Sequence, residues 1–236
     1  MSMRTDKWKN REDWDKEWEQ IFDRYQQDLR HAHYIRAVLE QADRRVLELA
    51  AGSFRDMALL NRLGVDCEGM DFSETSTQKA RERFPEIASK IHAADAFALP
   101  FKDKQFDVSY HNGFWVLFED EPIHRLVQEQ ARISRRAIIA TVHNAHNAQF
   151  KAYFERMART DPLYAIRFLD SAFMSEVMRP LCRSVRIIPV GKAKKRHEDL
   201  LIRYGLAHPR LMRFWFDRFA SRHIDSAERL MCVGVL

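Results

Sequence analysis

The chain is poor in cysteine and glycine and has no long apolar run. Its three cysteines, Cys67, Cys182 and Cys232, stand far apart and are odd in number. This excludes a disulfide framework and a zinc site and is typical of a reducing compartment. No apolar stretch approaches the roughly 18 residues that cross a bilayer. Residues 1–20 are charged and rich in tryptophan, unlike a secretory signal. We therefore expect a cytoplasmic protein with no membrane partner.

The composition is that of a folded chain with a modest excess of positive charge. Hydrophobic residues make up 46% and charged residues 31% of the 236 residues, which excludes a disordered chain. The net charge of +5 favours an anionic partner. Acids and bases are interspersed except in the basic run at 192–197, and one short run is more often a solvated loop than a nucleic-acid footprint. We do not expect nucleic acid as a partner.

Short apolar segments alternate with amphipathic ones along most of the chain. This alternation predicts an α/β fold, a doubly wound, mostly parallel seven-stranded sheet with helices on both faces. Strands are expected at residues 46–49, 65–70, 91–94, 106–110, 137–142, 185–190 and 231–236. Helical patterns occur at 14–25, 35–42, 56–64, 73–84, 121–134, 148–159, 170–178 and 211–219.

An acidic residue stands at or just after each of the first three predicted strands. These residues are Glu48, Asp71 and Asp95. Ligands of doubly wound sheets bind at the carboxyl ends of the strands, and Asp71 follows Glu48 by 23 residues, near the roughly 20-residue offset of a ribose-binding acid. An acid in such a place can also be merely solvated or cap a helix. A G-x-G-x-x-G dinucleotide fingerprint is excluded, because Ala50 and Arg55 replace two of its glycines. The series suggests a nucleoside held between Glu48 and Asp71.

Five segments follow one another in a recognisable order and spacing: Val46–Asp56, Gly69–Ser73, Ala94–Phe101, Phe106–Gly113 and Ala137–Val142. This series resembles a known family, the class I S-adenosylmethionine-dependent methyltransferases of the small-molecule type. The resemblance implies the Rossmann-like methyltransferase fold, methyltransferase activity and S-adenosyl-L-methionine as cofactor.

The resemblance also implies a role for each cofactor-binding residue. The methionine part would be organised by Glu48, lined by the backbone of Ala50, Ala51 and Gly52, and contacted by the backbone of His111. The ribose hydroxyls would bind Asp71, and the adenine would lie against Phe72, with its amino group on Asp95 beside the Ala96 amide.

Two departures from the family pattern concern the first and fourth motifs. Ala50 and Phe54 stand where the family has its first and third glycines, and we expect the bulky Phe54 either to turn away or to narrow the pocket. The His-His pair that often follows the fourth motif is replaced by Trp115 and its neighbours.

Three histidines follow the fourth and fifth predicted strands and are candidates for a catalytic base. They are His111, His143 and His146, of which we prefer His143. Histidine suits proton transfer near neutral pH, although each could instead be a hydrogen-bonded structural residue. His143 and His146 form a His-x-x-His pair without a third ligand at convincing spacing, so we expect no metal.

The segments outside the motif series divide the chain. We expect an N-terminal helical lid at 1–45 and a methyltransferase domain at 46–236, with helical insertions at 144–169 and 191–230. Aromatic residues of the first insertion could enclose an acceptor or pair two subunits, so a homodimer stays open.

Three functions are compatible with the sequence. The first is methyl transfer to a small-molecule acceptor, on a hydroxyl oxygen. The second, favoured by the basic charge, is an RNA or protein methyltransferase. The third, favoured by Phe54 and the missing His pair, is a non-catalytic binding or scaffold protein of this fold.

Overall fold

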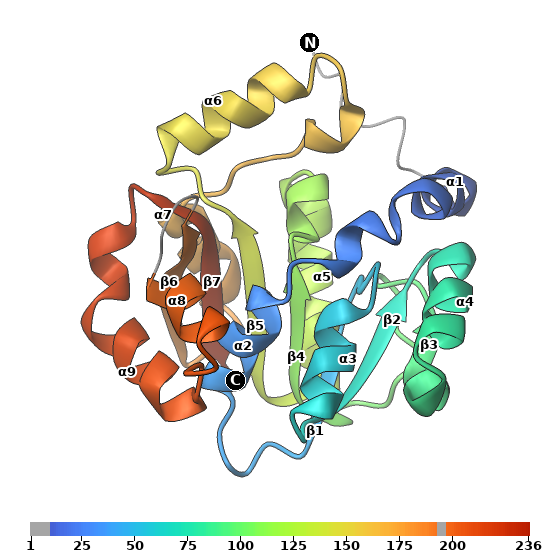
Figure 1. Ribbon diagram of the computed structural model, residues 1–236. Helices are drawn as coiled ribbons and strands as arrows, with labels where there is room; N and C mark the ends of the chain where they lie inside the picture. The colour runs from blue at the N-terminus through green and yellow to red at the C-terminus, as the bar shows by residue number, and fades with distance from the viewer. Residues whose placement is uncertain (1–9, 193–196) are drawn as a thin grey trace.

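The computed structural model describes residues 10–192 and 197–236. Within these ranges, seven strands form one sheet in the order β3-β2-β1-β4-β5-β7-β6 (Figure 1). Neighbouring strands from β3 to β5 are parallel, whereas β7 runs antiparallel to both β5 and β6. The strands are β1 (Arg45–Glu48), β2 (Asp66–Asp71), β3 (Ile91–Ala93), β4 (Phe106–Asn112), β5 (Ser134–His143), β6 (Ser184–Lys192) and β7 (Ala227–Val235). The predicted fold class is confirmed.

Helices cover both faces of the sheet. In Figure 1, α2, α3 and α9 lie in front of it, and α5 and α7 lie behind. The α-helices are α1 (Arg11–Ile21), α2 (Arg30–Val38), α3 (Arg55–Arg62), α4 (Glu74–Arg83), α5 (Asp120–Ile133), α6 (Ala148–Met157), α7 (Ser171–Met178), α8 (His197–Arg203) and α9 (Pro209–Arg218). Short 3-10 turns include η1 (Arg24–Gln26), η3 (Trp115–Leu117), η4 (Pro162–Tyr164) and η5 (Ala220–His223).

Polar side chains cap the amino ends of several of these helices by accepting a hydrogen bond from an amide of the first turn. Ser73 does so for α4, where its hydroxyl accepts from the Ser76 amide at 3.0 Å, as its polar sequence context predicts. Asn147 and Asp170 begin α6 and α7 in the same way. These caps fix the start of the helices that flank the sheet edge.

Three sequence-predicted elements differ from the structure. The helix expected at 35–42 is α2, which begins at Arg30 because His31, Ala32 and Tyr34 are buried against the sheet. The N-terminal apolar stripe is broken after α1, and Tyr25 belongs to η1. The last strand begins at residue 227, four residues before the expected start. Residues 193–196 of the basic run lie outside the described residues.

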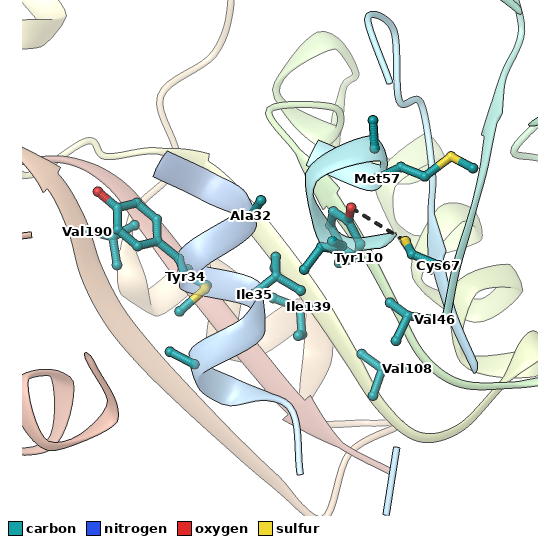
Figure 2. Packing of buried hydrophobic residues seen from close by; sticks show 14 of the residues in the cluster. Ala32, Tyr34, Ile35, Val46, Met57, Cys67, Val108, Tyr110, Ile139 and Val190 are labelled. Atoms are coloured by element: carbon teal, nitrogen blue, oxygen red, sulfur yellow. Dashed lines mark hydrogen bonds between the residues drawn. The ribbon is translucent and has the colours of Figure 1, made fainter. Parts of the chain in front are cut away.

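Two apolar clusters, one on each face of the sheet, form the core. The first packs α2, α3 and α9 on the sheet, and Figure 2 shows Ile35 and Ala32 of α2 above Ile139, with Met57 of α3 near Tyr110. The Tyr110 hydroxyl also lies 3.8 Å from the Cys67 sulfur. The second cluster packs α5 and α7 on the other face. Burial of side chains such as Ile35 contributes about 1.5–3 kcal/mol each, so the sheet is a fixed platform.

The strand order reverses between β1 and β4, which start crossovers in opposite directions. This switch point is where open α/β sheets bind ligands, outside the carboxyl ends of the strands. Because β7 is antiparallel, its amino end lies at the same edge, and Arg229 of β7 pairs in register with His143 at the end of β5. Helices α1 and α6 and turn η4 stand above this edge in Figure 1.

Candidate active site

One cavity of about 710 Å³ opens at this edge of the sheet. Its volume is within the range of roughly 300–1,000 Å³ that ligand sites occupy. Residues from β1, β2 and the loop after β3 line one half, and residues from β5, β7, α6 and η4 line the other. Nine of the sequence-predicted site residues line it: Glu48, Ala50, Ala51, Gly52, Asp71, Phe72, Asp95, Ala96 and His143.

Glu48 anchors the turn between β1 and α3. Its carboxyl group is buried and accepts a hydrogen bond from the Met57 amide at 2.9 Å, inside the first turn of α3. Burial, reinforced by the neighbouring Asp56 charge, raises the pKa of Glu48 well above its usual range. Glu48 therefore fixes the loop at 49–54 between β1 and α3, called the motif loop below.

Asp71, at the end of β2, ties the motif loop to the second strand. Its two carboxylate oxygens accept from the Gly52 amide at 2.8 Å and the Ser73 amide at 2.9 Å. Burial outweighs these hydrogen bonds and raises the pKa of Asp71 to about 6. Each ionised carboxylate oxygen can accept a further hydrogen bond, so Asp71 retains the capacity to bind hydroxyl groups of a ligand in the cavity.

The loop after β3 offers a second acceptor, and the residue after Asp71 offers an aromatic ring. Asp95 is exposed, and one of its oxygens accepts from the Phe97 amide at 2.9 Å. Phe72 also lines the cavity, and the guanidinium of Arg11 lies 4.8 Å from the centre of its ring.

Phe54 does not narrow the cavity. Its side chain is fully buried and packs beside Met57 beneath Gly69, where a Cβ atom would lie 2.9 Å from Phe54 Cδ1. Phe54 achieves this with a left-handed backbone, φ +55°, and Ala50 has φ +48°. The loop thus keeps the backbone conformation that favours glycine while carrying side chains, and Phe54 turns away, one of the two outcomes expected from the sequence.

Of the three candidate histidines, only His143 lines the cavity. Its ring centroid lies 5.0 Å from that of Phe154, and its Nδ1 has no hydrogen-bond partner among the residues described. Burial, together with the charge of Arg229, lowers the pKa of His143 well below its usual range. The imidazole is therefore neutral at neutral pH and able to accept a proton.

The other two histidines pack elsewhere. The ring of His111 is buried 4.7 Å from that of Trp115, and its Nδ1 accepts from the Phe114 amide at 3.3 Å. The cavity is lined by the next two residues, Asn112 and Gly113, in place of His111. His146 Nε2 lies 3.1 Å from the Ser171 hydroxyl and accepts from the Ser171 amide, at the start of α7. Neither imidazole is brought to the cavity.

Sequence reasoning missed one residue that lines the cavity and one buried residue that forms a hydrogen bond with the lining residue Asp56. Arg229 lines the cavity from the amino end of β7, which lies at this edge because β7 is antiparallel. The residues that follow the predicted strands therefore do not include it. His31 of α2 lies 2.9 Å from both the Asp56 carboxylate and the Thr141 hydroxyl, a buried link between α2, α3 and β5. No local pattern around His31 marks it, since its partners are 25 and 110 residues away.

Among the residues that the structure describes, no group of three or more histidine, cysteine, aspartate or glutamate side chains could hold a metal ion. In the same ranges, no helix is long and apolar enough to cross a membrane.

Comparisons of the sequence with known families and proteins find similarity to methyltransferases. A family model described as a methyltransferase domain matches residues 46–137. Two 2-phytyl-1,4-naphtoquinone methyltransferases are similar to this chain. The protein of Nostoc sp. (strain PCC 7120) is 33% identical over 118 residues, which cover 45% of this chain and 50% of that protein. That of Nostoc punctiforme is 28% identical over 157 residues, covering 62% and 66%. The chain thus spans about half to two thirds of the length of these relatives.

Solved structures share the whole fold at low sequence identity. A SAM-dependent methyltransferase from Archaeoglobus fulgidus has a TM-score of 0.64 at 15% identity, covering 94% of this chain and 98% of that one. A SAM-dependent methyltransferase from Thermotoga maritima, described as a possible histamine N-methyltransferase, has a TM-score of 0.63 at 16% identity, covering 93% and 95%. The resemblance of the motif series to the class I S-adenosylmethionine-dependent methyltransferases is confirmed: residues 46–137 match a methyltransferase domain, the similar curated proteins are methyltransferases, and the fold is that of solved SAM-dependent methyltransferases.

Proposed function

We propose that this protein transfers a methyl group from S-adenosylmethionine to a hydroxyl oxygen of a small-molecule acceptor. One observation carries the proposal. A single cavity joins the carboxylates of the first three strands to an aromatic half that contains an unpartnered histidine. A cofactor bound in the first half and an acceptor bound in the second would share one space.

The donor set of the first half fits the cofactor. Asp71 would accept hydrogen bonds from the ribose hydroxyls, and Asp95, beside Ala96, would accept from the adenine amino group next to Phe72. The loop Ala50–Gly52, which Glu48 and Asp71 hold in place, would line the methionine part. When bound, S-adenosylmethionine supplies an electrophilic methyl group on a sulfonium sulfur.

The second half would position the acceptor and take its proton. Phe154, Tyr164 and Ile166 form an apolar wall that excludes water from the acceptor. His143, neutral for the reason given above, would accept the hydroxyl proton as the oxygen bonds to the methyl carbon and the sulfur keeps the electron pair of the broken bond. Alignment by the wall and a positioned base are both ordinary sources of rate acceleration.

The N-terminal segment supports a lid at the cavity mouth. Trp14, Trp18 and Ile21 of α1 line the cavity, whereas Phe22 is buried in the core. By contrast, α2 packs in the core against α3 and α9. We therefore place the lid at α1 within the proposed 1–45 segment, with the 144–169 insertion as the opposite wall.

The experiment that tests this function is a methyl-transfer assay with labelled S-adenosylmethionine and separate pools of hydroxylated small molecules, RNA and protein. The expected result is label in a small-molecule product, with mass spectrometry placing the added methyl on oxygen. Label confined to RNA or protein would contradict the proposal. So would cofactor binding with no transfer to any pool, which is the outcome for a binding or scaffold protein.

A further inference from the structure

Arg229 is a cation in the floor of the cavity that lacks an acidic partner. Its Nη1 donates to the Asn112 side-chain oxygen at 3.3 Å. Within residues 10–192 and 197–236, no carboxylate lies within ion-pair distance of its guanidinium, although that of Arg30 has three such partners. Burial lowers the pKa of Arg229 to about 10, so the group stays charged at neutral pH.

The neighbouring acids are engaged by another residue. Asp28 accepts two hydrogen bonds from the Arg30 side chain, at 2.8 and 3.0 Å, and Glu228 lies 3.5 Å from the same guanidinium. Arg229 is half-buried, and a cation partly removed from water without an ion-pair partner is stabilised by a bound anion. The arrangement therefore suits a ligand that brings a negative charge.

The position of Arg229 assigns this anion to the acceptor. The Arg229 guanidinium reaches from β7 to the end of β4, where a Cβ atom at Gly113 would lie 2.9 Å from Arg229 Nη1 and 3.7 Å from His143 Cε1. The groups that would bind the nucleoside, Asp71 and Asp95, follow β2 and β3, on the other side of β1. Arg229 instead faces the half of the cavity that holds His143, its register partner on β5.

The rest of that half is apolar, and the rings of Phe154 and Tyr164 line it together with Leu163 and Ile166. The ring centroid of His143 lies 5.0 Å from that of Phe154 and 5.4 Å from that of Phe168, and the Phe154 ring lies 5.0 Å from that of Tyr164. Aromatic side chains of this kind bind flat apolar rings at their faces and edges. A single guanidinium with Asp28 close by suits one negative charge better than the two of a phosphate.

We infer that the acceptor is an aromatic carboxylate whose carboxylate pairs with Arg229 while its ring packs against Phe154 and Tyr164. This inference rests on the proposed function, because the bound carboxylate is a methyl acceptor only if the protein transfers methyl groups. The binding site itself is tested independently of methyl transfer. A guanidinium and a carboxylate form two parallel hydrogen bonds, which gives orientation as well as affinity. The ion pair would hold the ring of the acceptor in one orientation beside His143.

The test is calorimetric titration of the protein, saturated with S-adenosylhomocysteine, with 2-naphthoate and with its neutral analogue 2-naphthamide. Wild type should bind naphthoate more tightly, and Arg229→Gln should weaken naphthoate binding about 10- to 100-fold while leaving naphthamide within twofold. Arg210→Gln, which removes the same charge at an exposed position of α9, should change neither. Arg229→Lys should keep the preference for naphthoate with reduced affinity, and it serves if Arg229→Gln does not fold.

Three results would overturn the inference. Equal affinity of the wild type for naphthoate and naphthamide would remove the anion site. An unchanged naphthoate affinity in Arg229→Gln would place it elsewhere. A parallel loss of S-adenosylhomocysteine affinity in that variant would assign Arg229 to the carboxylate of the cofactor. If the wild type does not bind S-adenosylhomocysteine at all, the proposed function fails, and naphthoate and naphthamide titrated alone then decide this inference by the same comparison.

Discussion

The indole of Trp18 lies directly over the Cα of Gly52. A Cβ atom at position 52 would fall inside the van der Waals envelope of the Trp18 six-membered ring. Gly52 also has φ +56°, and its amide donates to Asp71. The contact therefore joins three parts of the site: helix α1 at the cavity mouth, the motif loop, and the acid proposed to bind the ribose.

Substituting Gly52 by alanine is expected to displace Trp18 and to weaken binding of S-adenosylhomocysteine. The left-handed backbone costs a residue with a Cβ about 1–2 kcal/mol, and the clash with Trp18 adds to this. Gly205→Ala is the matched control, because Gly205 has φ +68° and open space around it. Urea unfolding should show destabilisation in both variants, and calorimetry should show lost affinity in Gly52→Ala alone. Equal affinities would contradict the role of the contact.

Phe54 is expected to matter for stability and not for the cofactor. Phe54→Ala removes a fully buried ring and should lower the free energy of unfolding by about 3–5 kcal/mol. Its affinity for S-adenosylhomocysteine, measured on the folded fraction at low temperature, should stay within about twofold of wild type, an order-of-magnitude expectation for a side chain outside the cavity. Tighter binding by the variant, by more than that factor, would show that Phe54 obstructs the pocket.

Ala50→Gly is expected to stabilise the fold slightly, although glycine usually destabilises. Relief of the left-handed strain at Ala50, about 1–2 kcal/mol, outweighs the extra chain entropy of glycine in the unfolded state, about 0.4–1 kcal/mol. Ala58→Gly, in the middle of α3 with ordinary helical backbone, should instead cost about 1 kcal/mol. Chemical denaturation should show a higher free energy of unfolding in Ala50→Gly and a lower one in Ala58→Gly. Destabilisation of similar size in both variants would show that the backbone of Ala50 is not strained.

The raised pKa of Asp71 predicts a pH dependence with a definite sign. The folded state holds the Asp71 proton up to a pKa of about 6, whereas an unfolded aspartate titrates near about 3.9. The contribution of Asp71 to the free energy of unfolding is therefore largest below about pH 3.9. It is lost as the pH rises through about 6, and the loss is roughly 3 kcal/mol in all.

Binding of S-adenosylhomocysteine should show the opposite trend. Ribose hydroxyls donate to the ionised carboxylate, so affinity should increase from about pH 5 to about pH 7. Calorimetry across this range checks it, with Asp71→Asn as the variant in which the dependence disappears. A flat profile in the wild type would mean that the Asp71 carboxylate does not contact the ligand.

His143 is expected to act on the chemical step. Once an acceptor is found, His143→Asn should lower kcat about 10²- to 10⁴-fold, the usual contribution of a positioned base, with little change in affinity for S-adenosylhomocysteine. His146→Asn is the control, because that imidazole bonds to Ser171 outside the cavity. Equal losses of kcat in the two variants, or none in His143→Asn, would remove His143 from the mechanism.

The sheet and the positions of the acids proposed to bind the cofactor could be predicted, because both depend on local sequence. Short apolar strands and the acids that follow them are consecutive residues, and parallel strands bring Glu48, Asp71 and Asp95 to one edge whatever the helices do. Ser73 could be assigned as a helix cap for the same reason.

The half of the cavity proposed to bind the acceptor was predicted less well, because contacts between distant residues determine which side chains line it. Arg229 reaches the cavity only because β7 is antiparallel and begins four residues earlier than expected. The separation of His143 from His111 and His146 follows from side-chain direction: His111 turns to Trp115 and His146 to Ser171. No spacing in the sequence distinguishes these three imidazoles.

Cofactor binding is expected to depend most on Asp71 at the end of β2, and one measurement tests this directly. The purified protein is titrated calorimetrically with S-adenosylhomocysteine as wild type, as Asp71→Ala, and as Asp66→Ala, an exposed aspartate at the other end of the same strand. We predict micromolar binding by wild type and Asp66→Ala and its loss in a still-folded Asp71→Ala. Wild-type protein that does not bind, or Asp71→Ala that binds as well as wild type, would contradict the cofactor site described here.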